Sequence, residues 1–155
     1  MLIGLPGSGK STWIAEYRAR HPELNFQVVS SDNILEEKAQ QEGLDYADVH
    51  EKYIGFAIGE MERRFKSFLN EGAHIIHDQT NLSKKTRKKH LAKLKGYTKS
   101  AVVFTLSDKE WQRRYDKRKA DSGKGIPDYV IKNMIKGFEF PSRNEGFVTI
   151  THIRD

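Results

Sequence analysis

The chain has 155 residues, of which 31% are charged and 37% hydrophobic, and this balance indicates one folded domain and not a disordered segment. It has no Cys and no apolar run near the roughly 20 residues that span a bilayer, which excludes disulfides, thiol chemistry and a membrane-spanning helix. Its formal net charge of +6 favours anionic partners such as nucleotides, nucleic acids or phosphorylated compounds, although surface charge also serves solubility.

An apolar run, residues 1–3, leads into Gly4-Leu5-Pro6-Gly7-Ser8-Gly9-Lys10-Ser11-Thr12, which fits the pattern G-x-x-x-x-G-K-[ST]. Glycines lack Cβ, so the backbone here can curl round an anion with its N–H groups pointing inward. A helical pattern follows, and the order strand, loop, helix argues against a chance glycine-rich turn. We expect a phosphate-binding loop for ATP and Mg²⁺, with Lys10 on the β- and γ-phosphates and Ser11 on the metal. The residues expected to bind the nucleotide are Gly4, Pro6, Gly7, Ser8, Gly9, Lys10, Ser11 and Thr12.

Apolar runs and helical patterns then alternate to the end of the chain. Strands are predicted over residues 1–4, 26–30, 73–78, 100–106 and 147–153. Helices are predicted over residues 10–20, 34–41, 45–70, 83–95 and 108–120, and Pro127 opens a last one. Tyr46 begins the apolar stripe of the longest helix, which we interpret as core. This alternation predicts an α/β fold of the P-loop NTPase (kinase) type, one domain over residues 1–155 with a parallel five-stranded sheet flanked by helices.

Polar side chains follow the second and third predicted strands, where ligands collect in such folds. Asp32 is a candidate general base for a hydroxyl acceptor, and capping the next helix is an equally open role for it. Asp78 ends an apolar strand, where NTPases place an acid that holds Mg²⁺; the alternative is a turn residue. Thr80 and Asn81 are candidates for hydrogen bonds to substrate, or else for forming the turn.

Two segments are strongly basic. Arg114 and Arg118 lie four residues apart on one helix face, so they are candidates for a lid that clamps the nucleotide phosphates, with Arg118 also catalytic. The predicted helix over residues 83–95 is a candidate track for a nucleic-acid backbone. For both helices, a solvated basic face is the open alternative. The histidines at 74, 77 and 90 show no metal-ligand spacing.

At these residues the sequence resembles the kinase domain of polynucleotide 5′-hydroxyl kinases, as found in phage and animal end-healing enzymes. The resemblance covers nearly the whole chain and rests on residues 4–12, Ser31-Asp32, the run 78–82, Arg114-x-x-x-Arg118, Ile126-Pro127, Phe140-Pro141 and the run 145–147. It implies transfer of the γ-phosphate of ATP to a 5′-hydroxyl end of RNA or DNA. Asp32 would be the base, Lys10 and Arg118 would stabilise the phosphates, and Ser11 would hold Mg²⁺. The resemblance and the absence of a leader before the loop lead us to expect a cytoplasmic protein of a bacterium or a phage-infected cell, with no membrane partner and an unspecified oligomeric state.

The resemblance has limits. Leu35 stands where the phage enzymes carry an arginine that contacts the acceptor phosphate, and no Asp-x-Asp-x-Thr motif for a 3′-phosphatase is present. The chain also resembles the kinase-like domain of heterogeneous nuclear ribonucleoprotein U, which carries Asn where this chain has Asp32. Two other functions therefore stay open: a small-molecule kinase for a nucleoside, sugar or antibiotic, and a silent module that binds ATP and nucleic acid without turnover.

Overall fold

Short parallel strands form the centre of the molecule, and helices cover them. The computed structural model describes residues 1–154. In chain order the strands are β1 (Leu2–Ile3), β2 (Gln27–Val29), β3 (Ile75–His77), β4 (Ser100–Phe104) and β5 (Thr149–Ile153). The helices are α1 (Lys10–Arg20), α2 (Ser31–Glu42), α3 (Tyr46–Asn70), α4 (Lys84–Leu91), α5 (Asp108–Ser122) and α6 (Asp128–Lys136), with short 3₁₀ turns η1 (Pro22–Leu24) and η2 (Arg143–Glu145).

All strand pairs are parallel, and the α/β class is confirmed, but the sheet is not one continuous five-stranded ladder. Three strands pair in the order β1-β4-β5, and β2 pairs with β3. A single bridge between Leu2 and Asp78 joins the two groups. β1 has only two residues, and the Asn81 side-chain amide donates to the Leu2 carbonyl at 2.8 Å. A backbone acceptor that a longer ladder would use is therefore taken by a side chain.

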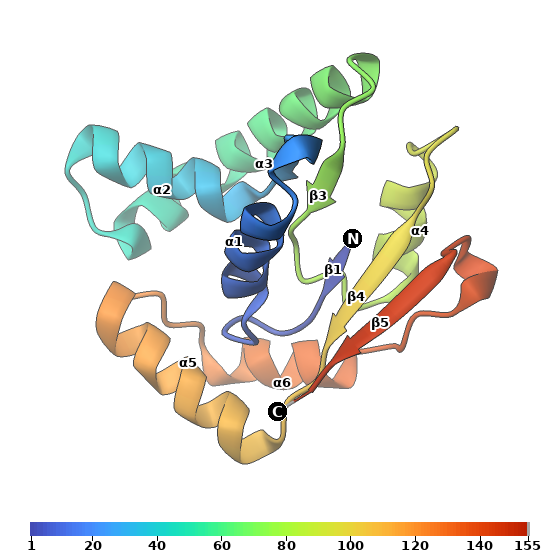
Figure 1. The fold of residues 1–155 in the computed structure, drawn as a ribbon. Helices are drawn as coiled ribbons and strands as arrows, with labels where there is room; N and C mark the ends of the chain where they lie inside the picture. The colour runs from blue at the N-terminus through green and yellow to red at the C-terminus, as the bar shows by residue number, and fades with distance from the viewer. Residues whose placement is uncertain (155) are drawn as a thin grey trace.

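Alternation along the strands divides the core between the two faces of the sheet. Leu2 packs with Ile76 and Phe104 against α1, whereas the next residue, Ile3, belongs to the larger cluster that includes Val29. The arrowheads of β3, β4 and β5 point toward the end of the molecule where α5 and α6 lie (Figure 1). The carboxyl ends of the strands, where the predicted site residues follow, therefore face α5. Within residues 1–154 no helix is both long enough and apolar enough to cross a membrane.

Helix α2 begins three residues earlier than predicted. The Ser30 hydroxyl accepts a hydrogen bond from the Asn33 N–H at 3.4 Å and so caps the helix at Ser31. Asp32 therefore lies in the first turn and does not cap the helix. That leaves its carboxylate free for contacts with other elements.

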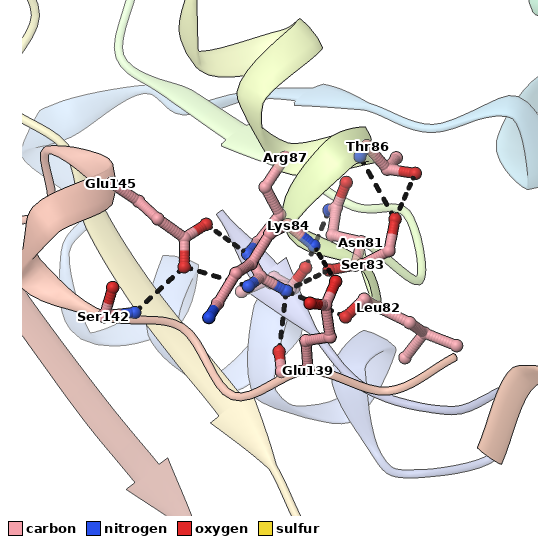
Figure 2. Close-up of polar contacts among 10 residues, drawn as sticks. Asn81, Leu82, Ser83, Lys84, Thr86, Arg87, Glu139, Ser142 and Glu145 are labelled. Atoms are coloured by element: carbon pink, nitrogen blue, oxygen red, sulfur yellow. Dashed lines mark hydrogen bonds and ion pairs between the residues drawn. The ribbon is translucent and has the colours of Figure 1, made fainter. Parts of the chain in front are cut away.

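Helix α4 is fixed to the rest of the fold through Arg87, whose side chain is fully buried (Figure 2). Its Nε and Nη2 donate to the two carboxylate oxygens of Glu145 at 2.7 and 2.9 Å. Its Nη1 donates to the carbonyls of Asn81, Leu82 and Glu139 at 2.9 to 3.1 Å. Burial by itself raises the pKa of Glu145, but Arg87 and the Ser142 N–H outweigh it, and the pKa lies below its usual value. Arg87 thus links the chain after β3 to the chain after α6, and it is not part of a solvent-facing basic track.

Candidate active site

The phosphate loop has the backbone geometry that its glycines predict. Gly7 and Gly9 have φ of 79° and 97°, which side chains rarely tolerate. At Gly4 a Cβ would lie 2.7 Å from Ser8 Oγ and 2.9 Å from Phe104 Cβ, so the loop folds only around a glycine there. No side chain caps α1 at Gly9, and the Ser8 hydroxyl is buried without a hydrogen-bond partner in residues 1–154. A helix terminus with free N–H groups inside a tight turn fits a phosphate group.

Lys10 folds back over this loop. Its Nζ donates to the carbonyls of Gly4 and Leu5, each at 3.0 Å. Burial lowers the pKa of Lys10 to about 8, although the Asp78 and Asp32 carboxylates oppose that shift. The ammonium is therefore still mostly charged at neutral pH, and it has neighbours that a phosphate oxygen could replace.

The Asp32 carboxylate lies between two helices. Its Oδ1 accepts a hydrogen bond from the Tyr46 hydroxyl at 3.0 Å, and its Oδ2 lies 3.6 Å from Arg118 Nη2. Burial and then the Asp32 charge raise the pKa of Tyr46 above its usual value, so the phenol stays protonated and donates. Slightly more than half of the Asp32 side chain, 53%, is exposed, so an acceptor molecule can reach it.

Asp78 ends β3 close to Lys10, and its own N–H continues the ladder to the Val29 carbonyl at 2.9 Å. Burial raises the pKa of Asp78, and Lys10 opposes the shift. Ser11 is exposed at the start of α1. No group of three or more His, Cys, Asp or Glu residues suited to a metal occurs in the described part of the chain. Because Mg²⁺ beside phosphates uses one or two protein ligands and keeps several waters, a serine and one acid still fit it.

Helix α5 lies directly over the phosphate loop. Trp111 Nε1 donates to the Pro6 carbonyl at 2.9 Å. A Cβ on Gly9 would lie 3.1 Å from Arg114 Nη1, and one on Gly7 would lie 3.5 Å from the Tyr115 backbone. Arg114 also donates to Glu110 at 2.5 Å. The predicted pair therefore faces the site from one side of α5, with Arg114 over the loop and Arg118 beside Asp32.

The segment after α5 makes a second contact with α2 and α3. Lys124 pairs with Glu36 and lies 4.7 Å from the centre of the Tyr46 ring. Tyr46, Glu36 and Lys124 were not predicted at the site. The sequence places Tyr46 in the core stripe of α3 and gives no signal for its contact with Asp32. The sequence gives no signal for Lys124.

Comparisons with known proteins place the chain in a family. A family model described as an AAA domain matches residues 1–141. The chain belongs to this family.

The AAA domain is similar to two curated proteins, heterogeneous nuclear ribonucleoprotein U-like protein 2 of Mus musculus and of Homo sapiens. Each is 22% identical over 98% of the chain, which spans only 21% of their length. A crystal structure of a Chloroflexus aurantiacus protein described as a kinase has a TM-score of 0.68 at 16% identity, covering 99% of this chain and 82% of that one. A gluconokinase from Sinorhizobium meliloti 1021 has a TM-score of 0.52 at 20% identity, covering 99% and 79%. The two solved structures show that the chain has the same α/β fold as these proteins.

Two predicted substrate contacts, Asn81 and Thr80, lie in different surroundings. Asn81 is 1% exposed and has φ of 49°, and its amide donates inward to the Leu2 and Gln79 carbonyls. This burial favours the alternative role, in which Asn81 forms the turn and holds it against β1. Thr80 accepts the Gly4 N–H with its carbonyl at 3.0 Å and is half-buried, which leaves its hydroxyl as a candidate. Leu35 is fully buried in the core, so that turn of α2 offers no cation to an acceptor.

Proposed function

We propose that this AAA domain is a kinase that transfers the γ-phosphoryl group of ATP to the 5′-hydroxyl end of an RNA or DNA strand, with Mg²⁺ as its cofactor. The observation that carries the proposal is the approach of Arg118 and Tyr46 to Asp32, at the strand end beside the phosphate loop. A hydroxyl kinase needs a carboxylate that accepts the acceptor proton and a cation beside it that can stabilise the transferring phosphate.

The residues of the loop supply the ATP side of the site. Backbone N–H groups of residues 4–12 would surround the phosphates, and Lys10 would exchange the Gly4 and Leu5 carbonyls for phosphate oxygens. Arg114 already lies against the loop at Gly9 and would neutralise phosphate charge. Ser11 and Asp78 would hold Mg²⁺, which when bound draws negative charge from the β- and γ-phosphate oxygens.

Asp32 supplies the acceptor side. Its carboxylate would hydrogen-bond the 5′-hydroxyl and take the proton as the new bond from oxygen to the γ-phosphorus forms. The bond between the γ-phosphorus and the bridging oxygen breaks, and ADP leaves with that oxygen. Arg118, already 3.6 Å from Asp32, would transfer its contact to the γ-phosphate and stabilise the charge of the transition state.

The choice of a nucleic-acid acceptor rests on the ordered set of motifs and on the net charge of +6. A small-molecule kinase is the second candidate, because a gluconokinase shares the fold. A module that binds ATP without turnover is the third, because the matched relatives carry ribonucleoprotein in their names. Asp32 argues against this third candidate, since a silent module has no need of a base beside Arg118.

An acceptor panel tests the proposal. Transfer of labelled γ-phosphate from ATP with Mg²⁺ is measured to a 5′-hydroxyl oligonucleotide, to its 5′-phosphorylated twin, and to a set of nucleosides and sugars including gluconate. Lys10→Ala serves as the control for contaminating kinases. We expect label on the 5′-hydroxyl oligonucleotide alone. Label only on a small molecule, or ATP binding with no label anywhere, would reject the proposal in favour of the second or third candidate.

A further inference from the structure

The sequence from Gln79 to Ser107 contains no acidic residue, and α4 lies inside this stretch. Its basic residues are Lys84, Lys85, Arg87, Lys88, Lys89, Lys93, Lys95 and Lys99. A run of this composition has no carboxylate of its own to neutralise it. Any neutralisation must come from other elements of the fold or from a bound partner.

The structure neutralises only part of this charge. Arg87 is buried against Glu145, and Lys93 pairs with Glu62 of α3. The inward face of α4 consists of Arg87, His90 and Leu91. The four lysines of α4, Lys84, Lys85, Lys88 and Lys89, are exposed, and none has a side-chain ion pair within the described residues. Lys84 lies nearest to acids, because its backbone N–H donates to the Glu139 carboxylate at 2.7 Å and its charge helps to lower the pKa of Glu145.

The basic residues of two other helices have acidic partners on their own helix. Arg63 and Arg64 of α3 pair with Glu60, and Arg113 and Arg114 of α5 pair with Glu110, each three or four residues away. On α4 the residues at that spacing are lysines, so Lys84 faces Lys88 and Lys85 faces Lys89 with like charge. The exposed face of α4 is therefore a concentrated positive strip.

We propose that this lysine strip, Lys84, Lys85, Lys88 and Lys89, binds the sugar-phosphate backbone of a nucleic-acid strand outside the active site. The inference rests on the proposed function for the identity of the strand, whose 5′ end would enter the site. The strip begins two residues after the run 78–82, which leaves β3 at the site, so one strand can contact both. At 1.5 Å rise per residue, the strip is roughly 7.5 Å long and faces about two successive phosphates of a strand.

The chemistry of the strip favours a phosphodiester backbone over a membrane. A helix that lies on a lipid surface inserts an apolar face, and the apolar face of α4 is already buried through Leu91. Helix α4 itself carries no Phe, Tyr or Trp on which a base could stack, so we expect its lysines to contact phosphates and not bases. Binding should accordingly depend on salt and not on base identity.

The test compares two variants that remove the same charge. One replaces Lys84, Lys85, Lys88 and Lys89 by Ala, and the control replaces four exposed residues on other helices, Arg18, Lys66, Lys109 and Lys132, by Ala. Binding of a fluorescent 15-nucleotide single strand is measured by anisotropy from low to high salt. Thermal melting checks folding, and the α4 variant should melt no lower than wild type because Ala favours helix and the lysine repulsion is removed.

We expect the α4 variant to bind the strand about 10- to 100-fold more weakly at low salt, with the slope of log affinity against log salt reduced by about 1.5, as expected for two phosphates of a single strand, and the control to lose far less. The value of kcat/KM for a minimal 5′-hydroxyl dinucleotide should stay unchanged. Equal losses in the two variants, or an unchanged salt slope, would overturn the inference while leaving the proposed function intact. Loss of polyglutamate binding without loss of oligonucleotide binding would overturn it in favour of an acidic protein partner. Strand binding that depends on α4, without phosphorylation of any end, would support the strip and reject the kinase.

Discussion

Helices α4 and α5 are both rich in Lys and Arg, yet they place these charges in different surroundings. On α5, Glu110 holds Arg113 and Arg114, and Arg118 reaches Asp32 on another helix. On α4, Arg87 turns into the protein and the exposed lysines have no acid near them in sequence. Basic residues that look alike in sequence can thus lie at the candidate active site, in the interior of the fold or on the outer surface.

The difference lies in which partners surround each cation. The buried Arg87 guanidinium donates to three carbonyls and one carboxylate. Without Arg87 these acceptors would lose their donors inside the protein, so Arg87 stabilises the fold. Arg118 is 23% exposed and has one distant partner, so it can change partner when a phosphate arrives. We therefore expect changes on α5 to alter the rate and changes at Arg87 to alter folding.

The largest effect is expected for Arg118→Ala. Loss of the cation that faces both Asp32 and the transferring phosphate should lower kcat about 100- to 1,000-fold, while the melting temperature stays near that of wild type. Arg113→Ala is the matched control on the same helix, because Arg113 is exposed and pairs with Glu110, away from Asp32. Similar values of kcat for the two variants in steady-state kinetics would contradict a catalytic role for Arg118.

Arg87→Met should lower the stability of the fold and leave kcat of the folded protein nearly unchanged. Removing one member of a buried ion pair leaves Glu145 and the carbonyls unpaired, so the free energy of unfolding should fall by about 3 kcal/mol. Urea denaturation measures this, and kcat of the folded fraction should remain near normal. Lys88→Met, one residue further along α4 but exposed, should cost little. An Arg87→Met protein as stable as wild type would contradict the role of Arg87.

Tyr46→Phe should have a moderate effect. The change removes the hydrogen bond to Asp32 Oδ1 and keeps the ring that Lys124 contacts. We expect kcat to fall about five- to tenfold with the KM for ATP unchanged, since one hydrogen bond to a partly exposed charge is worth about 1 kcal/mol. Tyr53→Phe on the same helix is the control, because its hydroxyl bonds Glu42 and not the site. A rise in the KM for ATP alone would show that Tyr46 does not act through Asp32.

The smallest effect is expected in the pH dependence. The pKa of Lys10 is about 8, lowered mainly by burial and further by Arg118. Above that pH the free enzyme loses the ammonium that binds phosphate, so kcat/KM for ATP should fall as pH rises through about 8. Removing a neighbouring cation raises the pKa of an ammonium group. In Arg118→Ala the falling limb should therefore move to higher pH, and a limb that stays in place would contradict the effect of the Arg118 charge on the pKa of Lys10.

The phosphate loop was predictable because glycine spacing specifies backbone angles locally. Gly4, Gly7 and Gly9 have the conformations or close approaches that only glycine permits, and Lys10 follows them in sequence. The α/β class followed from alternating apolar runs in the same way. Both properties depend on residues that are neighbours in the chain.

The parts that were missed depend on tertiary contacts. The cap of α2 is Ser30, the sheet is interrupted by the Asn81 amide, and Tyr46 reaches Asp32 only because α2 and α3 pack side by side. Arg87 could not be separated from its lysine neighbours by sequence, because its acid, Glu145, lies far along the chain. Sequence patterns located the basic residues but not their partners.

The central claim is that Asp32 takes the proton of a hydroxyl acceptor, and Asp32→Asn tests it most directly. Single-turnover transfer from labelled ATP to the 5′-hydroxyl oligonucleotide should fall at least about 100-fold, because the amide cannot accept the proton. The dissociation constant for ATP, measured on the same preparation, should stay close to that of wild type. Transfer at the wild-type rate with normal ATP binding would contradict the claim.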